Sequence, residues 1–149
     1  MSIQNFMAGY KRVWEAKDPV GFAALFTPDG SYYNTPFQVQ SGPSELAAYW
    51  ERILLQDDIS LSYQILGTSE DAGVAHWNVT YQVTSEELFQ IWAVSTGTGL
   101  PDRSPGDPLP RMELDGTLLA EFDKQGLATS ARIWWHSMPH PNEDQATGV

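Results

Sequence analysis

A two-strand pattern near the end of the chain constrains the fold more than any other feature. Residues 114–122 and 128–136 are β-rich runs, and Asp123-Lys124-Gln125-Gly126 separates them. Such a segment is typical of a tight turn, because its Gly tolerates positive φ. The second run ends in Trp134-Trp135-His136. We therefore expect a long β-hairpin that closes the fold.

The composition predicts a soluble protein of a single domain. The 149 residues are 42% hydrophobic and 18% charged, which is enough for a buried core. The net charge of −11 repels phosphate backbones and anionic lipids, so we expect neither nucleic acid nor membrane as a partner. The absence of cysteine excludes disulfides, thiolate nucleophiles and Cys-ligated zinc. With no signal-like segment and no apolar run of about 20 residues, a cytoplasmic location is expected.

Helical patterns fill most of the first third of the chain. Helical spacing of Phe6, Tyr10 and Trp14 predicts a helix over 3–16. Asp18-Pro19 has the residue types of an N-cap and first helical position, so a second helix is expected over 19–26, stopped by residues 27–30. A third helix is expected over 43–55, with Ser44 as its cap.

Strand patterns dominate the rest. Residues 31–34 are expected to form a short strand and 35–42 a loop. Alternating apolar and polar residues predict strands over 59–65 and 75–82, joined by a turn over 69–73. Residues 86–94 suit either a helical turn or a strand. Residues 97–110 hold four prolines and three glycines, which predicts an irregular loop.

Helices followed by a meander of strands predict an α+β fold. Three N-terminal helices would pack on one face of a strongly curved antiparallel sheet, with a conical pocket between them. We expect one domain over 1–149, with an insertion at 85–111 and a polar, frayed tail at 139–149. The insertion is longer than a hairpin needs, which favours either a lid over the pocket or a dimer arm.

The order of these elements and their turn residues resembles the nuclear transport factor 2-like superfamily, and within it the polyketide-cyclase-like (SnoaL-like) branch. The resemblance rests on Asp18-Pro19, Asp29-Gly30-Ser31, Gly42, and Phe122-Asp123 to Gly126 before a Trp-ended strand. It covers about residues 5 to 137. It implies the cone-shaped fold and leaves the function open, because this fold hosts enzymes, ligand carriers and interaction modules.

A more distant resemblance to ketosteroid isomerase implies three functional positions. Tyr10 matches that family's helix-one Tyr, Asn34 stands where the base is expected, and Leu118 stands at the position of the donor Asp. Asn cannot accept a proton at neutral pH. We therefore expect no copy of the isomerase mechanism, and leave open whether the chain is an enzyme.

Tyr10, Asn34 and His76 are the candidate catalytic residues. Tyr10 is either a hydrogen-bond donor in the pocket or a core aromatic residue, and Asn34 either orients a ligand or satisfies the strand end. His76 is a candidate because histidine is the residue type suited to acid/base chemistry at neutral pH, but alternation with Trp77 favours the convex face for it. The orientation of His136 is open in the same way: if Ala131, Ile133 and Trp135 face the pocket, then Arg132, Trp134 and His136 face outward.

The remaining polar residues suggest no further site. Glu113 and Asp115 share a strand face, which more often indicates a solvated strand edge than acid/base chemistry. The three histidines lack metal-ligand spacing, so neither a metal nor a cofactor is implied.

Large aromatic residues on the inward stripes give the best functional signal. They predict a pocket that binds a small, mostly apolar or aromatic molecule, with or without acid/base turnover of the polyketide-cyclase, dehydratase or isomerase type. The alternative is a non-catalytic ligand-binding or assembly module. A homodimer through the convex sheet face is expected in either case. The expected ligand-binding residues are Tyr10, Trp14, Asn34, Trp50, Trp77, Trp92 and Trp135.

Overall fold

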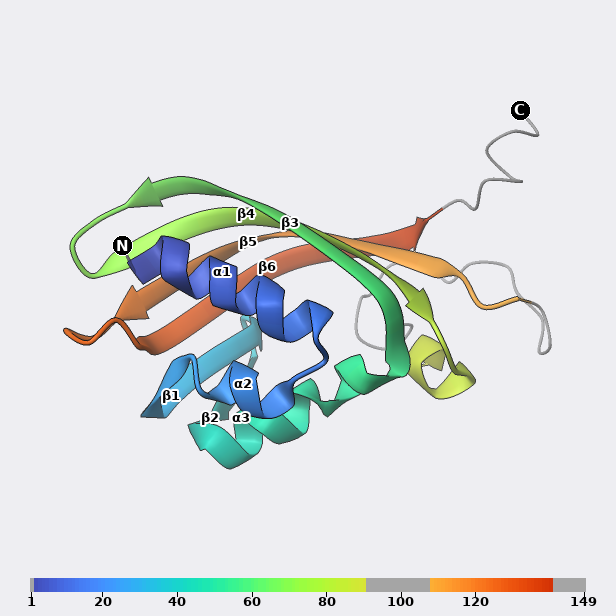
Figure 1. Cartoon of the computed structure of the whole chain (residues 1–149), viewed down its shortest axis with the longest axis horizontal. Coiled ribbons are helices and arrows are strands. Elements are labelled where there is room, and N and C mark those ends of the chain that lie inside the picture. The colour runs from blue at the N-terminus through green and yellow to red at the C-terminus, as the bar shows by residue number, and fades with distance from the viewer. Residues whose placement is uncertain (1, 91–107, 141–149) are drawn as a thin grey trace.

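The fold is a curved sheet with helices on its concave side. A computed structural model describes residues 2–90 and 108–140. Its helices are α1 (Ser2–Glu15), α2 (Pro19–Ala23), α3 (Gly42–Trp50) and the 3-10 helix η1 (Glu51–Leu55). Its strands are β1 (Phe26–Thr35), β2 (Gln38–Ser41), β3 (Gln56–Thr68), β4 (Ala72–Val83), β5 (Arg111–Phe122) and β6 (Ala128–His140). Figure 1 shows β3 and β4 arching over α1, with α2 and α3 nearer β1. The predicted α+β fold is confirmed.

The strand order in the described sheet is β2-β1-β6-β5-β4-β3. Neighbouring strands are antiparallel except β1 and β6, which run parallel. The sheet is therefore mixed, and the expectation of a wholly antiparallel sheet needs this correction. The β1–β6 pair joins segments separated by the whole meander, so no hairpin turn dictates their relative direction.

The second helix is shorter than its sequence pattern suggests. It ends at Ala23, and Phe26 already belongs to β1, where it pairs with Ala128. The amide of Ala128 donates to the carbonyl of Leu25 at 3.0 Å, which ties this junction to β6. Residues 27–30 lie within β1 at a register shift rather than in a helix stop. Pairing with a distant strand here outweighs the local turn chemistry.

The region expected to be a loop before the third helix contains strand β2. The third helix, α3, begins at Gly42, so its N-cap is Ser41 and not Ser44. The Ser41 amide donates to the Glu45 carboxylate at 2.9 Å, which satisfies a donor at the start of the helix. Regular α-helix ends at Trp50, and residues 51–55 continue as 3-10 helix.

The long strands extend beyond their predicted bounds. Strand β6 continues through Pro139 and His140, which pair with Met112 and Arg111, so the tail does not begin at 139. Residues 86–90 are helical, which decides the open alternative for that part of the insertion. Most of the proposed lid or arm, and residues 141–149, lie outside the described residues.

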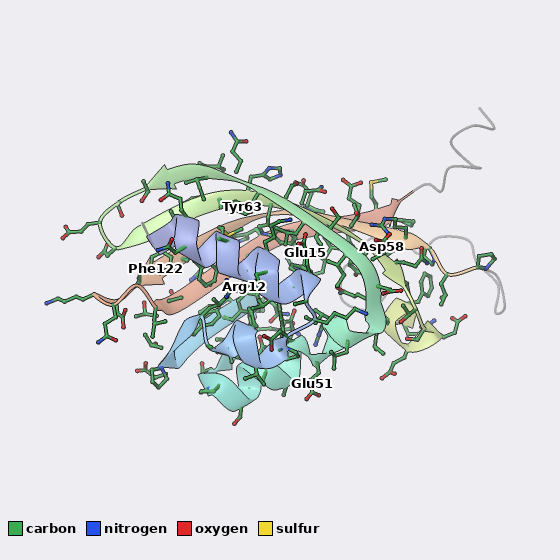
Figure 2. The ribbon with its side chains drawn as sticks, in the orientation of Figure 1. Arg12, Glu15, Glu51, Asp58, Tyr63 and Phe122 are labelled. Carbon is green, nitrogen blue, oxygen red and sulfur yellow. The ribbon has the colours of Figure 1, made fainter. Side chains whose placement is uncertain are left out.

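Helix α1 packs on β3 and β4 through its aromatic stripe. At its end the Glu15 carboxylate accepts from the Leu61 amide at 2.9 Å, and the Lys11 ammonium donates to the Leu61 carbonyl at 2.6 Å. Figure 2 shows Glu15 under the arch of β3. Burial opposes ionisation of Glu15, but the bonds from Lys11 and Leu61 lower its pKa overall. This polar contact fixes the helix against the strand that covers it.

Candidate functional site

A small cavity lies between the helices and the concave face of the sheet. Its volume is about 70 Å³, below the roughly 300–1,000 Å³ of pockets that hold drug-sized ligands. A neighbouring surface groove of about 250 Å³ shares part of its wall. The described lining of the cavity comes from both layers and consists of Trp14, Tyr32, Asn34, Thr35, Tyr49, Trp50, Arg52, Ile53, Gln56, Trp77, Tyr81, Leu88, Leu114, Ile133 and Trp135.

Three indole rings form the apolar wall. Trp14 comes from α1, Trp50 from the end of α3 and Trp77 from β4. The ring centroids of Trp50 and Trp77 lie 5.6 Å and 5.7 Å from that of Trp14. Trp50 also stacks on the buried Phe22 at 4.1 Å with an interplanar angle of 9°. Such offset and edge contacts suit aromatic quadrupoles and hold the rings in place. The wall is therefore suited to a flat apolar group.

Gly116 on β5 allows the Trp77 ring to lie close to the sheet. A Cβ atom at this position would stand 2.7 Å from the Trp77 ring and 2.7 Å from the carbonyl oxygen of Trp134. Both contacts are shorter than van der Waals distance, and one involves backbone. Because Gly116 has no side chain, the Trp77 ring can lie against β5, and there it forms the floor of the cavity.

Two polar atoms on lining residues are buried and have no hydrogen-bond partner in the described structure. The first is the amide oxygen of Asn34, whose side chain is 5% exposed and whose amide nitrogen donates to the Gln38 oxygen at 2.9 Å. The second is the indole N–H of Trp77, a side chain with no exposed area. Unpaired buried polar groups cost about 1–3 kcal/mol each. Both atoms belong to residues that line the cavity, one of them an acceptor and the other a donor.

The indole of Trp14 provides a direct contrast. Its N–H donates to the side-chain oxygen of Gln56 at 2.7 Å, and both side chains are buried. The Trp135 N–H donates to the backbone carbonyl of Asn34 at 2.8 Å. Trp77 differs from these neighbours in that its N–H has no partner among the described residues.

A group of tyrosine hydroxyls forms the polar side of the site. Tyr10 and Tyr32 share a buried hydrogen bond of 3.1 Å between their hydroxyls. Burial raises the pKa of each well above its ordinary value, and burial likewise raises the pKa of Tyr49 and Tyr81. These groups therefore remain neutral near pH 7 and act as hydrogen-bond donors rather than bases.

Arg52, on η1, is the charged side chain among the described lining residues. Its Nε donates to the Tyr49 carbonyl at 3.0 Å, and its guanidinium lies 4.0 Å from the centroid of the Tyr49 ring. Its charge acts against the burial effect on the pKa of Tyr32, Tyr49 and Tyr81. No carboxylate or imidazole belongs to the described lining, so no general base is found there.

The structure brings most of the expected ligand-binding residues to this cavity. Trp14, Asn34, Trp50, Trp77 and Trp135 line it. Tyr10 does not, because it is fully buried behind the wall, where its hydroxyl bonds to that of Tyr32 and its ring contacts the lining tryptophans. Trp92 lies outside the described residues.

His76 lies away from the cavity on the convex face. Its Nε2 is 2.9 Å from the Asp115 carboxylate, and Asn78 donates to both Glu113 and Asp115. These side chains form a hydrogen-bonded polar face of two central strands rather than a strand edge. Burial opposes ionisation of Asp115, but the bonds from Asn78 and His76 lower its pKa overall. His136 and Trp134 are exposed, which decides the open alternative for the last strand in favour of the register with these side chains outward.

The positions implied by ketosteroid isomerase are consistent with the loss of that mechanism. Asn34 lines the cavity with an amide, and Leu118 is fully buried in the core. Among the residues that the structure describes, no group of His, Cys, Asp or Glu is arranged to hold a metal ion. None of the described helices has the length and apolarity needed to span a membrane.

Sequence analysis did not identify Tyr49, Arg52, Gln56 or Tyr81 as site residues. Tyr49 and Arg52 stand three residues apart, a spacing that places them on one helical face. That spacing was the available signal for the Tyr49–Arg52 pair. No local signal links Gln56 to Trp14, because 42 residues separate them in the chain.

The model of the SnoaL-like domain matches residues 7–131. The chain belongs to the SnoaL-like domain family. A search of curated proteins gave no significant match.

Solved structures of similar fold have different functions in their descriptions. A protein from Catenulispora acidiphila with a ketosteroid isomerase-like fold, solved with trimethylamine, has a TM-score of 0.63 at 10% identity, covering 88% of this chain and 85% of that one. SalBIII, an epoxide hydrolase/cyclase-like enzyme of salinomycin pyran-ring formation, has a TM-score of 0.66 at 10% identity, and the match covers 92% of this chain and 95% of that one. A computationally designed 17-OHP binder has a TM-score of 0.67 at 15% identity, and the match covers 93% of this chain and 97% of that one. At these identities the likeness shows the fold alone.

Proposed function

We propose that this SnoaL-like domain binds a small, mostly apolar or aromatic molecule in the cavity beneath its sheet. The observation that carries the proposal is the pair of unpartnered atoms on two lining residues, the Asn34 amide oxygen and the Trp77 indole N–H. A ligand with one donor and one acceptor would satisfy both. The indole wall would cover its apolar body.

The cavity is small, so part of its wall must move to make room for the ligand. Cavity and groove share Asn34, Thr35, Ile133 and Trp135, which form the partition between them. Trp135 is only partly buried, and a single hydrogen bond to the Asn34 carbonyl holds its ring. We infer that displacement of this ring joins the two spaces and admits one or two fused rings.

Binding is a better-supported function than turnover. Acid/base turnover of the polyketide-cyclase, dehydratase or isomerase type needs a proton acceptor, and the described lining contains no carboxylate or imidazole. Turnover remains the second candidate because Arg52 and the Trp77 N–H would stabilise an oxyanion formed on the ligand. Proton exchange at the carbon next to a ligand carbonyl, followed in D₂O by NMR, would distinguish the two.

A cavity-blocking variant tests the binding proposal. Leu114 lines the cavity and is 8% exposed, so Leu114→Phe should fill the space. Leu66 is 56% exposed on β3, which makes Leu66→Phe the matched control. Isothermal titration with indole and benzamide should give binding to the wild type and to Leu66→Phe, with at least tenfold weaker binding to Leu114→Phe. Equal affinities in the two variants would place the probes elsewhere and refute the proposal.

We also propose a homodimer formed through the convex sheet face. On the outer side of β6, Trp134 is 47% exposed and Met138 is 54% exposed, and a partner on this face would bury both side chains. Sedimentation equilibrium should give twice the chain mass for the wild type and a reduced association for Trp134→Glu. A wild-type monomer at micromolar concentration would contradict this.

A further inference from the structure

Arg52 is held in place by Tyr49, while its terminal amino groups have no partner among the described residues. Its Nε–H bonds to the Tyr49 carbonyl, and its guanidinium plane lies against the Tyr49 ring. Within the described part of the chain, no hydrogen bond or ion pair engages the two terminal amino groups. These are the groups with which an Arg side chain grips a carboxylate by two parallel hydrogen bonds.

The net charge of the molecule is −11, and three other cations pair with carboxylates: Lys11 with Glu15, Lys17 with Asp57, and Arg111 with Asp58. Arg12, Lys124 and Arg132 have no such partner among the described residues, but they do not line the cavity. Arg52 is half-buried and lines the cavity without such a partner among the described residues. A partly buried cation without a counter-ion gives up part of its hydration and gains no ionic contact in exchange. An anion bound inside the cavity would supply that contact.

The influence of Arg52 is directed toward the interior of the site. Its positive charge acts on the hydroxyls of Tyr32, Tyr49 and Tyr81, three side chains that line the same cavity. The field of the guanidinium therefore reaches the space that a ligand would occupy. A second polar requirement comes from the buried amide oxygen of Asn34, which needs a hydrogen-bond donor.

We propose that the ligand is a small aromatic or alicyclic carboxylate, bound through its carboxylate by Arg52 and through a hydroxyl or N–H group by Asn34. This inference rests on the proposed binding function and adds the chemical class of the ligand. The apolar body lies against the indole wall, as argued above. The acidic surface of the protein repels anions, so a preference for a carboxylate has to come from the site itself.

Matched probes separate this inference from binding in general. Benzoate and benzamide have the same ring and nearly the same shape, and they differ in charge. Isothermal titration at pH 7 and about 0.15 M salt, where long-range repulsion is screened, should give at least tenfold tighter binding of benzoate. In the second pair, 4-hydroxybenzoate should bind at least threefold tighter than 4-methylbenzoate, because only the hydroxyl can donate to Asn34.

Two arginine variants identify the group responsible. Arg52→Gln should reduce the benzoate preference, measured as the ratio of benzoate to benzamide affinity, to within about threefold, and Arg52→Lys should retain part of the preference. Arg132 is the matched control, because its guanidinium also lies on a tyrosine ring, 3.8 Å from the centroid of Tyr33, but it does not line the cavity. Arg132→Gln should leave the preference intact.

The outcomes distinguish the two proposals. Binding of benzamide with no preference for benzoate would overturn the carboxylate inference and leave the binding function standing. A benzoate preference that persists in Arg52→Gln would also overturn it, since another group would then hold the anion. Failure of every probe to bind the wild type would refute both.

Discussion

Replacing Trp77 with Phe tests whether its indole N–H is truly without a partner. The side chain has no exposed area, and its N–H finds no acceptor in the described structure. Phe removes that donor and keeps a six-membered ring on the floor of the cavity. The substitution therefore separates the contribution of the N–H group from that of aromatic packing.

The expected change in stability is the sum of two opposing effects. The smaller ring leaves a void of roughly 40 Å³, which destabilises by about 1 kcal/mol at about 24 cal/mol per Å³. Removal of an unsatisfied buried donor stabilises by about 1–3 kcal/mol. Trp77→Phe should therefore change the free energy of unfolding by between about 0 and +2 kcal/mol, in the stabilising direction.

The matched control is Trp14→Phe, on the same cavity and also buried. In the wild type the Trp14 N–H donates to Gln56, so the substitution has two destabilising effects. The void destabilises by about 1 kcal/mol, and the loss of the donor to the buried Gln56 oxygen destabilises by about 1–3 kcal/mol. Trp14→Phe should destabilise by about 2–4 kcal/mol. Equilibrium urea unfolding, followed by far-ultraviolet circular dichroism because both variants alter Trp fluorescence, measures the difference.

Equal destabilisation of the two variants would refute the reasoning. It would mean that the Trp77 N–H has a partner in solution that matches Gln56 in strength. If the reasoning holds, the protein keeps at this position a donor that lowers its stability, as expected for a group reserved for a ligand. Trp77→Phe should then also weaken the binding of an acceptor-bearing probe such as benzamide, by about tenfold.

Other substitutions test the surroundings of the site. Gly116→Ala should destabilise by about 1–3 kcal/mol in urea unfolding, because its methyl group would overlap the ring of Trp77 and a neighbouring carbonyl; a change below about 0.5 kcal/mol would contradict the packing. Tyr10→Phe should cost about 1–2 kcal/mol, since a buried hydroxyl partner is lost, while leaving probe affinity within about twofold; a large loss of affinity would mean direct ligand contact. Asp115 has a lowered pKa in the folded state, so its stabilising effect is present above about pH 4 and is lost as the pH falls through its folded pKa. The stability difference between wild type and Asp115→Asn should accordingly be greatest at pH 6–7 and shrink in acid; a difference independent of pH would exclude the ion pair with His76 as its source.

Local residue patterns were sufficient for most of the longer elements of the fold. The spacing of Phe6, Tyr10 and Trp14 predicted α1, because one face of a helix repeats at that interval. The turn after Phe122 was also encoded locally: the Asp123 carboxylate accepts from the amides of Gln125 and Leu127, and Gly126 adopts a φ of +88°. Alternation along β4 likewise predicted which of its side chains point inward.

Pairing between distant segments was beyond the reach of such patterns. The turn-like residues 27–30 became part of β1 because β6 lies beside them, and the parallel direction of that pair follows from no neighbouring turn. The residue types predicted an aromatic pocket, and four of the expected tryptophans do line it. Tyr10 and Asn34 differ in outcome because depth in the core, which no periodicity reports, decides whether a side chain faces a cavity.

The sequence by itself determined most of the elements, their apolar faces and the resemblance to the SnoaL-like branch. These follow from local residue patterns and from the order of those patterns along the chain. Only the tertiary structure decided the chemistry of the site. It gave Trp14 a hydrogen-bond partner 42 residues away and left Trp77 without one among the described residues. It also brought Arg52 to the cavity with no carboxylate beside it in the described chain. Partners of buried polar groups are set by the packing of whole layers, and that packing is absent from any local pattern.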